Sequence, residues 1–127
     1  MIRGTSAQFK FKLPYTYDEI QTMTIKFWQP GNPDRALPII KQKHNCSELA
    51  EDGIYVSLRP SETAKFSDRY KAKMQLIAQP YFGATFGSKE RLITVYPMPD
   101  DIIIDDTDPD IPVIEEWIIL DGGTVVG

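Results

Sequence analysis

The chain contains one histidine and one cysteine, His44 and Cys46, which stand two positions apart. A thiol beside an imidazole could act as a nucleophile with its general base. Residues at positions i and i+2 rarely have the orientation of such a pair, and no third group that would orient the imidazole is evident. We therefore expect an inert, buried or half-buried thiol at Cys46 and no enzymatic activity. Two ligands are also too few for a zinc site, which needs about four.

Carboxylates stand at alternate positions from Asp106 to Asp110, as they do at the start of a calcium-binding loop. The pattern fails afterwards, because Ile111 stands where the glycine of that loop belongs and Trp117 where its bidentate glutamate belongs. The sequence also lacks a glycine-rich phosphate loop and a serine-centred nucleophile motif. We therefore expect a solvated acidic linker at these positions, with no metal and no cofactor.

The elements that would position any site are short strands, because apolar and polar residues alternate repeatedly along the chain. Residues 30–34 predict a hairpin turn, since Pro fixes φ and Gly and Asn accept positive φ. Residues 60–66 predict one helical turn that crosses between sheets, and residues 44–52 are expected to be irregular. Strands are predicted at residues 8–13, 21–29, 36–43, 53–59, 70–79 and 91–96. Six short strands with turns between them are typical of a small antiparallel β-sandwich.

Charge divides the chain into two unlike parts. All 14 Lys and Arg residues precede position 100, together with nine of the 18 acidic residues, which gives this part a net charge of +5. The remaining nine acidic residues lie in residues 100–127, without a basic residue among them. Such asymmetry marks an appendage that interacts electrostatically, although a solvated tail is the simpler interpretation. We predict a β-sandwich domain over residues 1–96 and an extended acidic C-terminal arm over residues 97–127.

The arm itself has two parts. Residues 97–112 are rich in Asp and Pro, cannot build a core and should be extended. Residues 113–120 are apolar apart from Glu115 and Glu116 and are costly to leave in water, so they are expected to pair as a strand with their own domain or with a neighbouring subunit. The residues predicted to bind a partner are Trp117, Ile118, Ile119, Leu120, Asp105, Asp106, Asp108 and Asp110.

Other classes of partner are less favoured by the sequence. The Lys and Arg residues alternate along strands without forming a stripe, and the acidic arm would compete for them, so no nucleic acid is expected. No apolar stretch approaches the 18 or so residues that a membrane span needs, and the N-terminus lacks the apolar region of a signal peptide. Aromatic residues could stack on sugars, and the candidates for such a platform are Trp28, Tyr55, Tyr81 and Phe82.

Several short motifs resemble those of small virion-associated structural proteins of bacteriophages and prophages. The likeness begins at Met1-Ile2-Arg3-Gly4-Thr5 and spans about residues 1–101. It continues through Phe9, Leu13-Pro14, Ile25-Lys26-Phe27-Trp28-Gln29, the region of Cys46, Ile54 to Leu58, Glu62-Thr63-Ala64-Lys65-Phe66, Met74-Gln75-Leu76, Ser88 and Asp100-Asp101. The resemblance implies an immunoglobulin-like sandwich and a role in particle assembly. The extended C-terminal arm departs from the usual short form.

These observations together predict a bacteriophage virion structural protein, either a head-decoration or head-fibre protein or a tail or baseplate accessory. Its expected partners are other virion proteins and copies of itself, within a homo-oligomer or a larger assembly. We expect it to be made in the cytoplasm of a bacterial host and to reside in the virion. The alternative is a β-sandwich module that binds a glycan or a host receptor.

Overall fold

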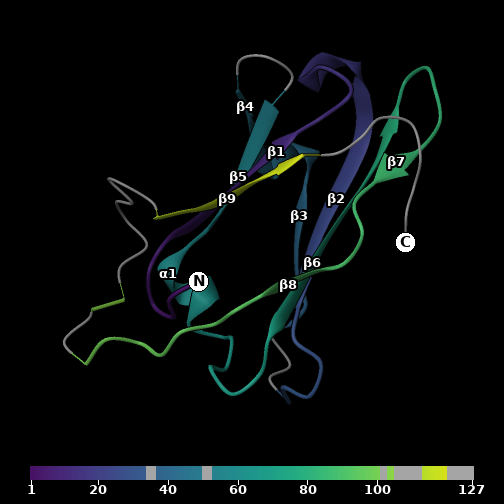
Figure 1. The fold of residues 1–127 in the computed structure, drawn as a ribbon. Coiled ribbons are helices and arrows are strands. Elements are labelled where there is room, and N and C mark those ends of the chain that lie inside the picture. The colour runs from purple at the N-terminus through teal and green to yellow at the C-terminus, as the bar shows by residue number, and fades with distance from the viewer. Residues whose placement is uncertain (34–36, 50–52, 101–102, 105–112, 120–127) are drawn as a thin grey trace.

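The computed structural model describes residues 1–33, 37–49, 53–100, 103–104 and 113–119 of the chain. Within these residues it is an all-β sandwich whose strands are joined by three short helical turns (Figure 1). The elements are β1 (Ala7–Lys12), the 3₁₀ turn η1 (Tyr17–Glu19), β2 (Ile20–Trp28), β3 (Ile39–Gln42), the 3₁₀ turn η2 (Lys43–Asn45), β4 (Cys46–Leu49), β5 (Gly53–Leu58), α1 (Pro60–Thr63), β6 (Ala72–Pro80), β7 (Phe86–Gly87), β8 (Arg91–Ile93) and β9 (Val113–Ile119).

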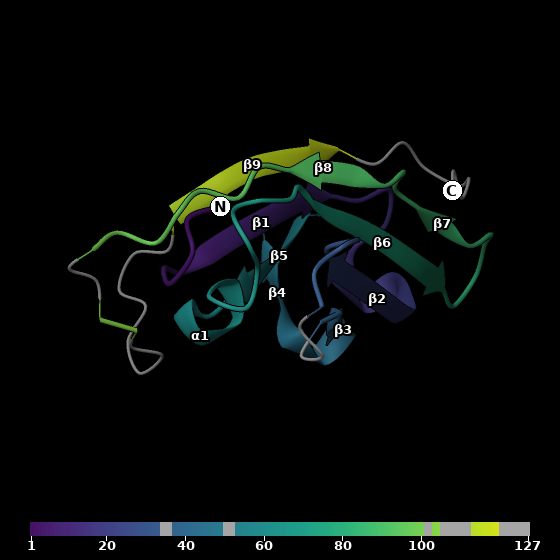
Figure 2. The same ribbon diagram turned by 90° about the horizontal axis from the view of Figure 1, so that it is seen from below.

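The strands belong to two sheets. The first sheet has the order β4-β5-β1-β9, and the second has the order β3-β2-β6 with both β7 and β8 paired to the far edge of β6. Figure 2 shows β9 beside β1 in the first sheet and β6 beside β2 in the second. All these pairs are antiparallel except β1 with β9, which is parallel.

The core lies between the inner faces of the sheets and follows from the alternation of the sequence. Buried and more exposed residues alternate along β1, β5, β6 and most of β2, because successive side chains of a strand face opposite sides; the exception is an irregularity between Ile20 and Thr22. The rings of Phe9 and Phe27 meet at 5.1 Å between centroids and join the two sheets. The largest fully buried side chains are Phe9, Phe11, Phe27, Phe66, Phe86, Ile20, Ile25, Ile54, Leu58, Met74 and Leu76.

The predicted all-β sandwich is therefore confirmed, and the long strands lie within two residues of their predicted bounds. The predicted hairpin joins β2 to β3, which are antiparallel neighbours. The predicted helical turn is α1, and it crosses from β5 in the first sheet to β6 in the second.

One prediction was wrong, because residues 44–52 are not irregular throughout. Cys46–Leu49 forms β4, which pairs with β5 at the edge of the first sheet. This strand has only four residues and polar neighbours, so its sequence carries too little alternation to be detected. β7 has only two residues and was missed for the same reason.

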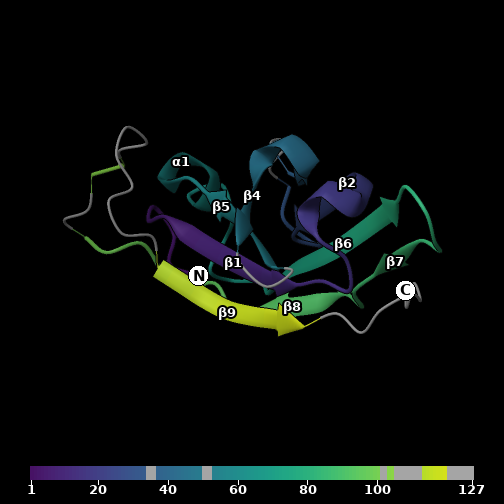
Figure 3. The same cartoon turned by 90° about the horizontal axis from the view of Figure 1, so that it is seen from above.

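A second difference concerns the direction of the last strand, since β9 runs parallel to β1 within a sandwich expected to be antiparallel. The reason lies in where the chain enters β9. Tyr96 forms a bridge with Ile2, close to the start of β1, and Val113 lies opposite Ala7, at that same end. A strand that starts beside the first residue of β1 must run in the direction of β1, as both arrows do in Figure 3.

Gln29 is a buried polar residue that ties two loops to the end of β2. Its Nε2 donates hydrogen bonds to the carbonyl oxygens of Ser67 at 2.6 Å and Tyr70 at 2.7 Å. Its Oε1 accepts from the backbone N–H of Ser67 at 2.8 Å and from Nδ2 of Asn32 at 2.7 Å. The amide is thus satisfied on both sides, as burial at 4% exposure requires.

Replacing this amide by an apolar side chain of similar size should destabilise the fold. In Gln29→Leu the backbone groups of Ser67 and Tyr70 lose their partner, which costs about 3 kcal/mol of unfolding free energy. The matched control is Gln79→Leu on the exposed face of β6, expected to change stability by less than about 0.5 kcal/mol. Urea denaturation measures both, and equal stabilities of the two variants would contradict this role of Gln29.

Candidate functional site

A polar cleft with several convergent polar groups lies where the edges of the two sheets meet. Its volume is about 380 Å³. The turn η2 creates it, since it carries the chain from β3 in the second sheet to β4 in the first. The residues that line it are Ser6, Lys41, Asn45, Ser47, Tyr55, Ser57, Leu58, Arg59 and Pro60.

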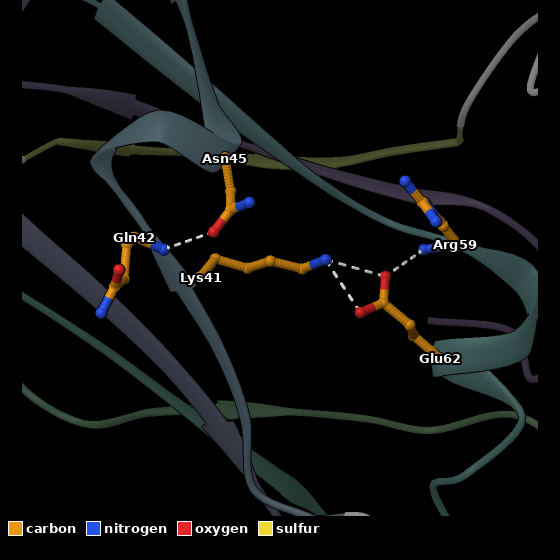
Figure 4. Close-up of polar contacts among 5 residues, drawn as sticks. All are labelled: Lys41, Gln42, Asn45, Arg59 and Glu62. Atoms are coloured by element: carbon orange, nitrogen blue, oxygen red, sulfur yellow. Dashed lines mark hydrogen bonds and ion pairs between the residues drawn. The ribbon is translucent and has the colours of Figure 1, made fainter.

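An ion pair bridges one side of the cleft (Figure 4). Lys41 on β3 reaches Glu62 on α1, with Nζ at 2.9 Å and 2.8 Å from the two carboxylate oxygens. Glu62 also accepts a hydrogen bond from the backbone N–H of Arg59 at 2.9 Å. The two charged side chains are only 15% and 18% exposed, so their contact is better shielded from water than a surface pair. The carboxylate therefore fixes both β3 and the start of α1.

The turn η2 is held on the other side of this ion pair. The backbone N–H of Gln42 donates to Oδ1 of Asn45 at 2.9 Å, which closes the turn on itself (Figure 4). In the first sheet, Ser47 lies opposite Tyr55, and Ser57 follows two residues later on the same face of β5. The cleft thus presents hydroxyl, amide and cationic groups over a floor that includes the buried Leu58.

These groups can bind but offer little for covalent chemistry. Serine hydroxyls and an asparagine amide are donors and acceptors for a neutral polar ligand, and Arg59 adds a cation at the rim. Within the residues that the structure describes, no group of three or more His, Cys, Asp or Glu side chains could hold a metal ion.

Cys46 and His44 do not form a pair at this cleft. Cys46 is buried, as predicted, and its Sγ donates a hydrogen bond to the carbonyl oxygen of Gln42 at 3.4 Å. Burial raises the pKa of the thiol to about 11, although the charge of Lys41 opposes this in part. His44 is exposed on η2 and lines a different cleft of about 360 Å³ with Thr22, Thr24 and Gln42.

The strand predicted in the acidic arm is present and belongs to the first sheet. In β9, Trp117 lies opposite Lys10, Ile118 opposite Phe11 and Ile119 opposite Lys12. Of the two pairings left open by the sequence, this is the one with the chain's own domain. The other residues predicted to bind a partner lie outside the described residues, namely Leu120, Asp105, Asp106, Asp108 and Asp110.

The four aromatic residues predicted as a sugar platform do not come together. Trp28 lies opposite Lys73 near the start of β6, and Lys26 caps its ring with Nζ at 4.8 Å from the centroid. Tyr81 and Phe82 follow the last residue of β6, at the other end of the sheet. Only Tyr55 lines the cleft.

The sequence did not reveal the cleft, because its residues come from three separate stretches of the chain, at residue 6, residues 41–47 and residues 55–60. Lys41, Asn45 and Arg59 carry no motif, and each could equally be an outward-facing residue of a strand or loop. The one signal was the predicted crossover at residues 60–66, which places α1 between the sheets.

Comparison with protein families, curated proteins and solved structures returned no match for this chain. The likeness to phage structural proteins and its immunoglobulin-like assignment therefore stay predictions. Of the helices in the described residues, none is long and apolar enough to cross a membrane.

The raised pKa of Cys46 predicts slow reaction with thiol reagents in the native state. At pH 8 a pKa of about 11 leaves roughly one thiol in a thousand ionised, against about a tenth for a cysteine with the ordinary pKa of 9.0. Labelling of the folded chain by a disulfide reagent should therefore be at least about 100-fold slower than labelling in urea.

The same shift predicts how stability depends on pH. The unfolded chain releases the Cys46 proton at an ordinary pKa near 9 and the folded chain at about 11. The contribution of the buried neutral thiol to the free energy of unfolding is therefore intact below pH 9 and is lost as the pH rises from 9 to 11. Urea denaturation from pH 8 to pH 11 of the native chain and of Cys46→Ala measures the difference.

In the labelling experiment, equal rates in the folded and unfolded states would contradict a buried thiol.

Proposed function

We propose that this chain is a bacteriophage virion structural protein that assembles through its β-sandwich and its C-terminal segment. The proposal includes a head-decoration or head-fibre protein and a tail or baseplate accessory. Its partners are other virion proteins and copies of itself, and no catalysis is involved. The motifs of residues 1–101 and the pairing of β9 with β1 support it.

The observation that carries the proposal is that the segment before β9 is much longer than the distance it has to cross. Tyr96 pairs with Ile2 and Val113 with Ala7, so the connection begins and ends at points five residues apart along the N-terminal segment. Such a gap is at most about 18 Å, whereas residues 97–112 can span up to about 50 Å. The connection is therefore long enough to place β9 on the β1 strand of a neighbouring copy.

Pairing on a neighbour would use the same backbone hydrogen bonds as pairing within the chain. Without β9, β1 would present a row of unpaired N–H and C=O groups along its free edge. A strand added to such an edge obtains affinity from main-chain hydrogen bonds and specificity from its side chains. Exchange of an identical strand between copies costs little in contact energy, so a high local concentration in a particle favours it.

The charges of the two parts support the same arrangement. Six aspartates lie between positions 100 and 112, while the part of the chain before position 100 has a net charge of +5. A linker of this charge is attracted to the basic domain of a neighbour and repelled by another linker. Electrostatic attraction would guide the approach, and pairing of β9 would complete it.

Two adjacent prolines in β9 test this role. The N–H groups of a strand point alternately to either side, so Ile118→Pro with Ile119→Pro removes a donor toward β1 whichever residue faces it. The matched control is Val125→Pro with Val126→Pro, which leaves β9 intact. Each chain is expressed in a bacterial host while that host produces the phage to which the chain is proposed to belong. The phage particles are then purified and analysed by mass spectrometry.

We expect the native chain and the control in the particles, and the β9 variant to be folded but absent from them. Absence of the native chain from every purified particle would overturn the virion role. Incorporation of the β9 variant at the native level would leave the virion role standing and overturn assembly by strand pairing.

A second function, binding of a glycan or host receptor, is favoured by one observation, which is that Tyr55 lines a cleft rich in hydroxyl and amide groups. If this function holds, a glycan array should give saturable binding that is lost in Ser57→Trp, which fills the cleft. The control is Trp28→Ala, whose ring lies elsewhere. Binding that survives in Ser57→Trp would exclude the cleft as the site.

A further inference from the structure

The hairpin between β6 and β7 ends in an exposed aromatic tip, formed by Tyr81 and Phe82. Phe82 is 90% exposed and Tyr81 is 58% exposed. The stretch from Met74 to Ser88 contains no charged residue, in a chain that is 25% charged. An exposed phenylalanine at the end of an uncharged hairpin is costly to leave in water, and aromatic side chains of this kind commonly anchor protein interfaces.

This tip is held in place by the neighbouring structure. The backbone N–H of Tyr81 donates to the carbonyl oxygen of Glu19 at 3.0 Å, and Pro80 lies opposite Ile20. Gly83 has φ +126°, and a Cβ at this position would meet the hydroxyl of Tyr15 at 2.5 Å, so the turn requires glycine. The tip is therefore already ordered before binding, which lowers the entropic cost of an interface.

The charges beside the tip are mostly negative. Asp18 and Glu19 are exposed on η1, next to the hydrogen bond that holds Tyr81. Hydrogen bonds from the backbone and side chain of Thr16 lower the pKa of Glu19. A basic residue, Lys43, also lies in this region: its Nζ lies over the ring of Tyr17 and donates to the carbonyl oxygen of Ile20.

The polar cleft extends from the turn η2 to α1, and its basic groups include Arg59 at the end beside α1. Arg59 and Lys41 line it, Lys10 lies opposite its residue Tyr55 in the sheet, and Glu62 is the acidic group at its side. Ser6, which lines the cleft, precedes β1, and Tyr15, which meets the tip, follows it. Figures 1, 2 and 3 all place α1 and the β6–β7 hairpin at opposite ends.

We propose that the Tyr81–Phe82 tip of one copy inserts into the polar cleft of a second copy, so that the chain associates head to tail. The phenyl ring of Phe82 would lie against the half-buried ring of Tyr55, and Asp18 and Glu19 would approach Arg59 and Lys10. The cleft, at about 380 Å³, has room for one aromatic side chain. Because the tip lies at the opposite end of the domain from α1, a copy cannot place Phe82 at the α1 side of its own cleft.

A head-to-tail contact of this kind uses different surfaces on the two partners and repeats to form rings or open chains. The contact rests on the proposed assembly role for its biological meaning, but it uses neither β9 nor the residues of the acidic linker. One aromatic anchor in a half-polar cleft gives weak binding, so the contact should depend strongly on concentration. Acidic groups beside the tip disfavour an anionic membrane as the alternative target of Phe82.

The test uses the full chain and two variants that each lack one half of the contact. Phe82→Ser removes the tip but keeps the cleft, and Ser57→Trp fills the cleft but keeps the tip. Leu92→Ser is the matched control, because Leu92 is an exposed apolar residue, at 61%, on the distant strand β8. Sedimentation velocity over a wide range of concentration measures association, and circular dichroism checks that every variant is folded.

We expect the native chain and Leu92→Ser to form species larger than dimers as concentration rises. Each variant alone should associate at least about tenfold more weakly, since burial of the ring is lost. A mixture of Phe82→Ser with Ser57→Trp restores one tip and one cleft, so it should form dimers of one copy each and grow no further.

Three results would overturn the contact: a native chain that stays monomeric at its highest soluble concentration, Phe82→Ser that associates like the native chain, or a mixture that stays monomeric. Flotation with neutral or anionic phospholipid vesicles that requires Phe82, together with unchanged self-association in Phe82→Ser, would assign the tip to membranes instead. The double-proline variant of β9 keeps both tip and cleft, so failure of strand pairing leaves this contact intact and is seen separately.

Discussion

The structure depends on the position that the core fixes for β1. Phe9 and Phe11 on this strand are fully buried, so β1 cannot leave the sheet without exposing the centre of the core. Its backbone groups can pair with a strand on each side, and an unpaired outer edge would be open to another strand. β5 supplies one side by antiparallel pairing, and β9 supplies the other by parallel pairing. The acidic C-terminal segment is therefore connected to the fold through the strand that the core fixes most firmly.

The two ends of β1 also organise the surfaces at which another molecule could bind. Its start adjoins Ser6 and the polar cleft, and the chain beyond its end reaches Tyr15, which contacts the β6–β7 hairpin. Arg59 and Lys41 lie near the first end and Asp18 and Glu19 near the second. The domain thus has basic residues towards one end of β1 and acidic residues towards the other. Strand pairing through β9 and insertion of Phe82 are separate contacts, and a molecule that has both can bind neighbours on more than one side.

Much of the fold could be predicted from the sequence, because burial on one face imposes alternation on a strand. Met74, Leu76 and Ala78 in β6 illustrate this, since all three are buried and the residues between them are not. β4 is too short to show the pattern, and the parallel direction of β9 follows from the position of Tyr96 beside Ile2, which no local signal encodes. The cleft could not be predicted either, since Lys41 and Glu62 meet only after both sheets have formed. Gln29, Thr63 and Ser88 stand in the motifs on which the predicted phage resemblance rests, and in the described chain they are buried polar residues that hold loops and strands in place.

Amide hydrogen exchange in β1 of the full native chain tests the occupation of its second edge most directly. The N–H groups of Ala7–Lys12 point alternately toward β5 and toward β9. If β9 pairs with β1, both sets are protected, and exchange measured by NMR should be slow along the whole strand. Fast exchange at every second residue, with protection only toward β5, would show a free edge and contradict the account.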